Sequence, residues 1–236
     1  DIGDETLNYY LAKNTAARES MITKAVEEIE KYQSISKHNF EKQFKQYFDT
    51  EKVSFEMNLA IANFIEKFHD YKVSKKNQVV LDEFKEMIIE HFEDHKDVVC
   101  HRDYHGRNLH VKEEELIHID FQDARIGPRE YDLVSLIEDS YFRLEPQMKE
   151  RLKELFFENN RNYYANYEDF KSKFRIVAIQ RIFKALGSFC YLKLEKNKEG
   201  YEKYISNAME NLRHYLEEDD RFNEFRLLLV EIYYGN

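Results

Sequence analysis

Tryptophan is absent from the 236-residue sequence, and cysteine, proline and glycine are scarce, with two Cys, two Pro and six Gly. So few turn-forming residues argue against a β-rich fold with many tight turns and favour long helices. Cys100 and Cys190 lie in apolar surroundings without paired spacing, which indicates buried free thiols in a reducing compartment. The aromatic core is therefore expected to consist of Phe and Tyr.

The chain also lacks an excess of positive charge and any long apolar run. Its formal net charge is -10, which argues against nucleic acid as a partner, because a basic face dominates that affinity. The densest apolar stretch, residues 227–232, is interrupted by Glu231 and is too short to cross a bilayer. The first ten residues have neither a basic start nor an apolar run, so no signal peptide is expected. These features predict a cytoplasmic protein with no membrane partner.

Apolar residues recur at helical spacing along most of the chain. Such stripes run through residues 7–11, 17–29, 40–48, 53–68, 81–92, 146–158, 170–194, 199–217 and 221–234. Asp4 is expected to cap the first helix, and Asp132 fits the N-cap of a further helix from Tyr131. Glu56 and His91, on apolar faces, are expected to be satisfied structural groups. The stripes predict an α+β, predominantly α-helical chain forming a single domain over residues 1–236.

The residues with the clearest chemistry lie between His101 and Asp123. The sequence from His101 to Asn108 resembles the protein-kinase pattern H-R-D-x-x-x-x-N, and Asp120-Phe121-Gln122 stands where D-F-G follows. Asp103 would accept or orient the proton of an attacking hydroxyl. Asn108 and Asp120 offer hard oxygen ligands to Mg²⁺, which takes further ligands from ATP phosphates and water.

Two short strands are expected between these ligands. Residues 109–111 and 116–119 have strand character, and the charged residues 112–115 suit a turn between them. A hairpin would return Asp120 to the side of Asn108, so that both could share one metal ion. Asp and Asn often cap helices or form turns, but such roles would not explain why Asp103, Asn108 and Asp120 occur together in the order and spacing of the kinase motif.

The segments "HRDYHGRNL" and "IDFQDARIGPREYDLVSL" resemble the aminoglycoside phosphotransferase and choline kinase-like superfamily. Within it, "GDETL", "FEMNLAIANFI" and "IQRIFKALGSF" are similar to the bacterial anomeric kinases of N-acetylmuramate and N-acetylglucosamine. The resemblance implies a kinase-like C-terminal lobe whose small β-hairpin carries the metal-binding motif. It also implies that His101 and Asp132 support the loop that carries Asp103.

Other polar residues are candidates for contacts with substrate or phosphate. His105 and Arg107 follow the catalytic acid, although loop packing explains His105 equally well. Gln122 and Asp123 follow the metal ligand and could bind sugar hydroxyls, and Asp123 could instead cap a turn. Gln180, Arg181 and Lys184 interrupt an apolar helix; they form either a solvated face or, as the resemblance suggests, part of the substrate cleft.

A glycine-rich phosphate cover and a strand lysine are missing from the sequence. Before the Asp103 motif the only glycine is Gly3, and Val177-Ala178-Ile179-Gln180 has Gln where the lysine motif needs Lys. The N-terminal lobe that covers ATP is therefore expected to be absent from this chain and to come from the full-length protein.

The leading hypothesis is an ATP- and Mg²⁺-dependent kinase acting on a hydroxyl of a small polar molecule, an amino sugar at its anomeric position. An aminoglycoside or choline-type kinase is the alternative substrate class, for which an acidic pocket is expected. A non-catalytic, kinase-like binding module is the alternative of a different class. The isolated chain is expected to be inactive without its N-terminal lobe.

Overall fold

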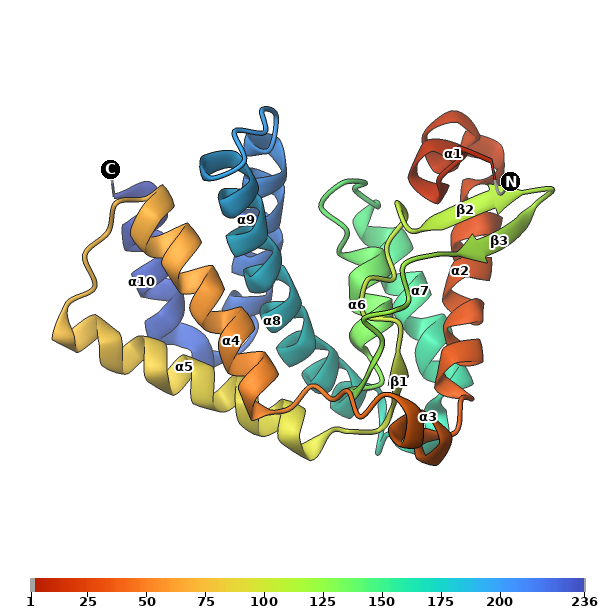
Figure 1. Ribbon diagram of the computed structural model, residues 1–236, viewed down its shortest axis with the longest axis horizontal. Helices are drawn as coiled ribbons and strands as arrows, with labels where there is room; N and C mark the ends of the chain where they lie inside the picture. The colour runs from red at the N-terminus through yellow and green to blue at the C-terminus, as the bar shows by residue number, and fades with distance from the viewer. Residues whose placement is uncertain (1–2, 236) are drawn as a thin grey trace. The chain divides into compact units, whose positions relative to one another are not determined.

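The computed structural model describes residues 3–235, and the chain divides into two compact units. The first unit comprises the segments 1–47 and 95–174, and the second comprises 48–94 and 175–236. All strands belong to the first unit, whereas the second is helical (Figure 1). The prediction of a predominantly helical α+β chain is confirmed.

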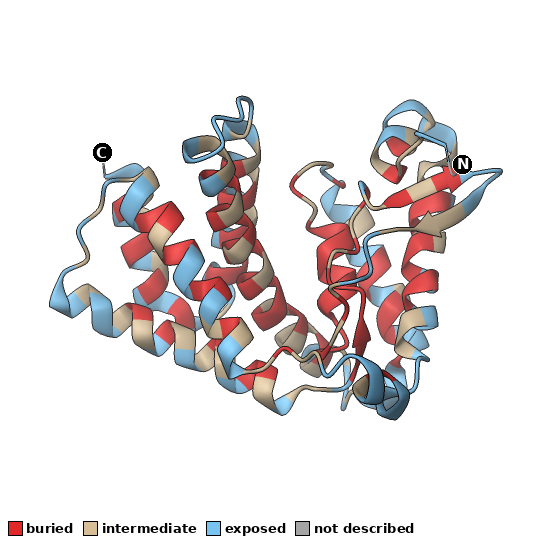
Figure 2. Ribbon diagram, viewed as in Figure 1, coloured by how far each residue is buried: buried red, intermediate tan, exposed pale blue. Residues whose placement is uncertain are grey.

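The first unit begins with helices and continues into two small sheets. Its elements are α1 (Leu7–Lys13), a 3₁₀ turn (Thr15–Ala17), α2 (Arg18–Gln33), α3 (Lys37–Gln43), β1 (Val98–Cys100), β2 (Leu109–Lys112), β3 (Glu115–His118), β4 (Arg125–Gly127), α6 (Tyr131–Ile137), α7 (Pro146–Asn159), a 3₁₀ turn (Arg161–Tyr163) and the start of α8 (Tyr167–Leu194). α2 packs against β1, α6 and α7. α6 is buried along its whole length (Figure 2), so the loops beside it have a rigid support.

Each sheet has two antiparallel strands. β2 pairs with β3 in the register Leu109 to His118, and β1 pairs with β4 in the register Val98 to Gly127. The expected hairpin is present. Val111 donates its N–H to the Glu5 carbonyl (2.8 Å), which attaches the N-terminal segment to β2.

Three sequence-based boundaries in this unit were wrong. The N-cap of α1 is Thr6, whose hydroxyl accepts from Tyr9 N–H, and not Asp4. α3 ends at Gln43 although the aromatic spacing continues to residue 48, and Lys45 has a positive φ of 48°, which no helix accommodates. Asp132 lies inside the first turn of α6, where Glu130 takes the N-cap position.

The second unit is a helical cluster around phenylalanine rings. Its elements are α4 (Thr50–Ala60), a π-helix (Ile61–Phe68), α5 (Lys75–Asp94), the remainder of α8, α9 (Glu202–Glu217), a 3₁₀ turn (Asp220–Phe222) and α10 (Asn223–Tyr234). The rings of Phe84 and Phe225 stack with centroids 3.5 Å apart, and Phe183 meets both edge-on. These contacts join α5, α8 and α10 through one aromatic core.

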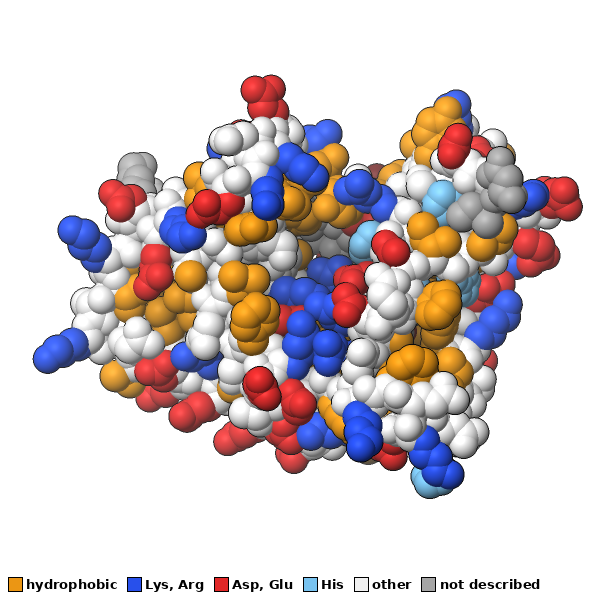
Figure 3. Space-filling model, in the orientation of Figure 1, with side chains coloured by type: hydrophobic (Ala, Val, Ile, Leu, Met, Phe, Trp, Pro, Cys, Tyr) orange, Lys and Arg blue, Asp and Glu red, His pale blue; other side chains and the backbone are white. Residues whose placement is uncertain are grey.

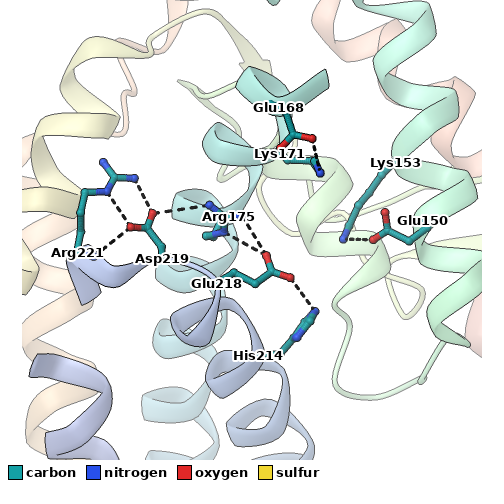
Figure 4. A network of polar contacts seen from close by, with 9 residues as sticks. All are labelled: Glu150, Lys153, Glu168, Lys171, Arg175, His214, Glu218, Asp219 and Arg221. Atoms are coloured by element: carbon teal, nitrogen blue, oxygen red, sulfur yellow. Dashed lines mark hydrogen bonds and ion pairs between the residues drawn. The ribbon is translucent and has the colours of Figure 1, made fainter. Parts of the chain in front are cut away.

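A set of ion pairs ties α8 to the junction of α9 and α10 in this unit (Figure 4). Arg175 contacts Glu218 at 3.2 Å and Asp219 at 3.8 Å, and Arg221 binds Asp219 at 2.7 Å. The bond from Arg221 lowers the pKa of Asp219, whose carboxylate also caps the 3₁₀ turn. Within residues 3–235, no helix combines the length and apolarity needed to cross a membrane.

Candidate active site

The loop from His101 to Asn108, here called the Asp103 loop, follows the buried strand β1. Asp103 is half-buried, with about a third of its side chain exposed to solvent (32%). The Asn108 side-chain amide donates to the Asp103 carbonyl (3.1 Å), which closes the loop on itself. Asp103 therefore sits in a constrained loop while its carboxylate still reaches solvent.

α6 holds the start of the Asp103 loop through Asp132. The Asp132 carboxylate accepts from the backbone N–H of His101 (2.7 Å) and of Arg102 (2.9 Å). The Ser135 hydroxyl donates to the Arg102 carbonyl (3.3 Å) one turn later. Because Asp132 is buried and ionised acceptors make strong bonds to amides, these contacts fix the loop on a rigid helix.

His101 is the buried side of the same loop. Its ring is fully buried and meets the rings of Tyr32 and Tyr104 edge-on, with centroids 5.2 and 5.6 Å away. Burial is the main reason that the pKa of His101 falls to about 4. The Tyr104 hydroxyl donates to the Ala25 carbonyl of α2 (2.7 Å), which attaches the middle of the loop to that helix.

The hairpin brings Asn108 and Asp120 together. Beyond the β2–β3 ladder, the Ile119 N–H donates to the Asn108 carbonyl (3.0 Å), so Asp120 directly follows a residue paired with Asn108. Asp120 is exposed and has a left-handed φ of 62°, a conformation that Asp adopts more readily than most residues. Since the Asn108 amide nitrogen binds the Asp103 carbonyl, its side-chain oxygen is left for another ligand.

Asn108 and Asp120 together form an incomplete metal-binding set. Among the residues that the structure describes, no group of three or more His, Cys, Asp or Glu side chains could hold a metal by itself. Asn108 and Asp120 supply two hard oxygens, which suits Mg²⁺ bound jointly by protein, phosphates and water. The residues thus fit a metal that arrives with a phosphorylated ligand and do not form an all-protein cage.

Arg102 was not among the residues singled out from sequence, yet it contacts both halves of the site. Its guanidinium lies 2.9 Å from the Asp123 carboxylate and 3.7 Å from that of Asp103. Only 9% of the residue is exposed, and its φ of 77° is unusual for a side chain of this size. Asp123, expected to touch sugar or cap a turn, is paired with Arg102.

His105 and Arg107, at the far end of the loop, face Tyr141. The guanidinium of the exposed Arg107 lies over the Tyr141 ring at 4.5 Å, and the His105 ring is 6.0 Å from the same ring. This arrangement supports the loop-packing role that was left open for His105. Arg107 retains solvent access, so a contact with phosphate stays a prediction.

Asn8 of α1 closes over the loop at Gly106. Its backbone N–H donates to the Gly106 carbonyl (3.1 Å), and its side-chain amide donates to the Asp139 carboxylate (3.0 Å). A Cβ at Gly106 would stand 1.9 Å from the Asn8 side-chain oxygen, so a larger residue there would require the Asn8 side chain to move. Asn8 and Asp139 were missed because 131 residues separate them.

A second buried network supports the hairpin from α2. His118 of β3 lies 2.8 Å from the Glu28 carboxylate and, through its other ring nitrogen, 2.8 Å from the Tyr32 hydroxyl. Glu28 is only 6% exposed and also pairs with Lys31 at 2.9 Å. The strand that leads into Asp120 is therefore anchored two residues before the carboxylate.

Gln122 lines a cavity of about 430 Å³ in the first unit. Its walls carry aromatic, aliphatic and amide side chains and no charged group: Tyr32, Ile35, Asn39, Phe40, Gln43, Phe44, Gln46, Val99, Phe121, Gln122 and Ala124. Phe121 and Phe44 are more than half exposed, and hydrophobic side chains gather on the surface above α3 (Figure 3). The cavity is of a size that small ligands use, and it presents amides rather than carboxylates.

Arg181 belongs to the second unit, on α8, and is half-buried. The polar group around it is not a solvated face. Gln180 is fully buried and donates to the buried Glu56 (3.0 Å), which also lies 3.6 Å from Lys184 and 3.3 Å from Lys52. Glu56 thus has the satisfied structural role expected of it, and a substrate contact of Arg181 stays a prediction.

Two curated proteins that resemble this chain carry the same description. Over 220 residues the chain is 25% identical to an N-acetylmuramate/N-acetylglucosamine kinase of Neisseria meningitidis serogroup B, covering 92% of this chain and 65% of that protein. It is 30% identical over 127 residues to a kinase of the same description from Pseudomonas aeruginosa, covering 51% and 36% of the two chains. The chain therefore spans less than two thirds of the length of either relative.

The fold has a counterpart among solved structures. The choline kinase of Cryptosporidium parvum Iowa II superposes with a TM-score of 0.60 at 12% identity, over 100% of this chain and 74% of that one. Residues 9–170 match the model of the phosphotransferase enzyme family, APH, and this segment contains Asp103, Asn108 and Asp120. Since that match extends over more than half of the sequence, the chain belongs to the phosphotransferase enzyme family.

Proposed function

We propose that this chain is the catalytic lobe of an ATP- and Mg²⁺-dependent kinase that phosphorylates a hydroxyl of a small polar molecule. The observation that carries the proposal is the hairpin geometry. It places Asn108 beside the residue before Asp120, while the Asn108 amide also closes the loop of Asp103. One acid and two metal-type oxygens are thereby brought together from three separate sequence positions.

In this proposal Asp103 orients the acceptor hydroxyl and accepts its proton as the bond to phosphorus forms. Asn108 and Asp120 hold the Mg²⁺ that arrives with the nucleotide, and the ion neutralises charge on the phosphates. Phosphoryl transfer asks a protein mainly for positioning, which the bonds from Asp132 to the loop provide. His101 supports the loop from its buried side, and Arg107 and His105 are the candidates for phosphate contact.

The proposed acceptor is an N-acetylated amino sugar, phosphorylated at its anomeric hydroxyl. Two relatives are described as kinases of N-acetylmuramate and N-acetylglucosamine. The cavity that contains Gln122 has no carboxylate, whereas an aminoglycoside or choline would be met by acidic groups. A wall lined by amides and without carboxylates therefore favours N-acetyl sugars, whose amine is acylated and uncharged, over the cationic alternatives.

We further propose that the nucleotide-covering lobe is supplied from outside these 236 residues, forming with them what is here called the complete kinase. The support is compositional, because the sequence contains no glycine-rich phosphate loop. The Neisseria relative is also longer, since the chain spans 65% of it. This lobe would supply the remaining contacts to the phosphates held at Asp120. Arg181 of α8 is kept as a candidate for contact with the acceptor.

The test is a Mg²⁺ titration of sugar-dependent ATP consumption by the complete kinase and by its Asp120→Asn variant. The variant should require a higher Mg²⁺ concentration and lose turnover, while its affinity for N-acetylglucosamine alone changes little. Excess Mg²⁺ should partly rescue the milder Asn108→Ala variant. An unchanged Mg²⁺ dependence would remove both residues from the metal site.

Glucosamine, choline and kanamycin serve as cationic comparison substrates in the same assay. Turnover of N-acetyl sugars well above that of the amines is expected. Preference for an amine would replace the sugar in this proposal by the alternative substrate class. Sugar binding without turnover in the complete kinase would identify a non-catalytic binding module.

A further inference from the structure

The Arg102 side chain has two carboxylate neighbours at unequal distances. The pair with Asp123 is at full salt-bridge distance, 2.9 Å, whereas the Asp103 carboxylate is 3.7 Å away. The Arg102 side chain is 11% exposed, that of Asp103 32% and that of Asp123 51%. A nearly buried cation needs a carboxylate partner, and here the more exposed of the two acids provides the closer contact.

The backbone of Arg102 is held in place by other bonds. Its N–H and carbonyl bind Asp132 and Ser135 of α6, and its φ of 77° lies in the left-handed region. For a large side chain this conformation is strained, and it persists only where surrounding contacts impose it. It directs the guanidinium toward the segment that follows Asp120, in which Asp123 lies.

We propose that Arg102 and Asp123 form a latch that positions Asp103: Asp123 holds the guanidinium and thereby keeps it from closing onto the catalytic carboxylate. This inference rests on the proposed kinase function and deepens it. Asp123 is then a positioning residue rather than a sugar ligand. The same ion pair ties the Asp103 loop to the segment that begins at the metal ligand Asp120.

The physical basis is competition for one cation. Arginine binds carboxylates through a planar fork, and a direct pair with Asp103 would turn that carboxylate toward Arg102. A carboxylate so engaged is a poorer acceptor for the hydroxyl proton and lies off the line of attack. Because Asp123 is at the shorter distance, the structure favours the arrangement in which Asp123, and not Asp103, is the main partner of the guanidinium.

Asp123→Asn in the complete kinase should lower kcat roughly 10–100-fold, the usual range for a lost residue that supports a catalytic group, with little change in KM for the sugar. Asp123→Glu should recover a large part of kcat because it restores the charge. A crystal structure of the Asp123→Asn variant should show the guanidinium at about 2.8 Å from the Asp103 carboxylate, the usual distance of a charged pair.

Two substitutions of Arg102 separate positioning from folding. Arg102→Gly relieves the backbone strain, since glycine accepts a positive φ, and removes the guanidinium. It should fold, and because no guanidinium is left to close onto Asp103, it should lose less kcat than Asp123→Asn. Arg102→Lys keeps a charge but not the planar guanidinium, so a partial loss of kcat is expected.

The control is Glu115→Gln on the same hairpin, where the exposed carboxylate pairs with Lys24 at 2.7 Å. Removing that surface ion pair should leave kcat and KM unchanged.

The outcomes distinguish this inference from the function on which it rests. Wild-type enzyme without turnover on any acceptor would overturn the kinase proposal. An active wild type whose Asp123→Asn variant keeps its kcat would overturn the latch alone. An Asp123→Asn variant with a raised KM for the sugar and an unchanged kcat would also overturn the latch. It would indicate that Asp123 contacts the sugar.

Discussion

Two residues of the Asp103 loop occupy opposite environments although they are only two positions apart. His101 is fully buried between tyrosine rings, and Asp103 keeps a third of its side chain in solvent. The first position requires a neutral, well-packed group, whereas the role proposed for Asp103 requires a carboxylate that a substrate can reach. Substitutions at the two positions should therefore affect different properties.

Asp103→Ala should lower the turnover of the complete kinase by roughly 10²–10⁴-fold, the range typical of a lost general acid or base. Stability should change little, because the side chain is half-exposed and the loop is held by backbone bonds to Asp132. Steady-state kinetics together with thermal unfolding measure both quantities. Near-normal turnover would exclude Asp103 from the mechanism.

His101 predicts a pH dependence of stability. Its pKa is about 4 in the folded protein against an ordinary 6.5, so the unfolded state binds more protons between these values. Stability should be fully present above about pH 6.5 and decline toward pH 4, by at most about 1.4 kcal/mol for each pH unit. His101→Phe should make the slope shallower over this window.

The slope is measured by urea unfolding at several pH values, with His38→Phe as an exposed control that should retain it. Burial also lowers the pKa of His118, so the contribution of His101 is the difference between wild type and variant. Equal slopes for the wild type and His101→Phe would contradict the assignment.

At the scale of elements, two close approaches of backbone determine the packing. The hairpin aligns Asn108 with Ile119, and the end of α4 meets α8 at a glycine. A Cβ at Gly187 would stand 2.4 Å from the Ala60 Cα and 2.9 Å from its Cβ. Backbone atoms cannot yield as a flexible side chain can, so the second unit depends on this glycine.

Gly187→Ala should destabilise the protein. Alanine in a helix interior gains about 1 kcal/mol over glycine, but overpacking of a tight contact typically costs about 1–3 kcal/mol and more against backbone. Ser188→Ala, one residue on and half-buried, gains helix propensity without the clash and should lie within about 0.5 kcal/mol of wild type. Urea unfolding followed by circular dichroism compares the two, and a more stable Gly187→Ala would refute the contact.

At the scale of the whole molecule, each unit has its own buried residues. The first has a core of Phe40, Val99, Ala124 and Ile126, and the second has the stacked pair Phe84 and Phe225. The proposed phosphate site is different, because Asn108 and Asp120 are its two proposed metal ligands and the sequence has no glycine-rich phosphate cover to accompany them. We therefore expect this chain to be able to fold without being able to catalyse phosphoryl transfer.

The 236-residue chain should fold alone and show no measurable kinase turnover. Asp103 cannot act unless the transferred phosphoryl group is held in line, and such positioning contributes several kcal/mol to lowering a barrier. An ATP-consumption assay with N-acetylmuramate and N-acetylglucosamine tests activity, and calorimetry tests sugar binding. Steady turnover by the chain alone would disprove the need for a further lobe.

Local patterns in the sequence determined most of the helices, the hairpin and the candidate chemical residues. Apolar spacing needs only neighbours within a few residues, so the helical stripes and the β2–β3 pair followed from it. Asp103, Asn108 and Asp120 were recognisable because their order and spacing form one motif. Where competing local signals were close, as between Asp4 and Thr6, the sequence alone did not identify the helix start.

Contacts between distant segments were decided by the tertiary structure alone. The bonds of Asp132 to the Asp103 loop span about 30 residues, that of Gln180 to Glu56 spans 124, and that of Asn8 to Asp139 spans 131. No periodicity connects such positions, because their proximity arises only when helices and strands pack. The pairing of Arg102 with Asp123 is of the same kind: the charges are visible in the sequence, but which carboxylate the arginine binds depends on how the loop folds.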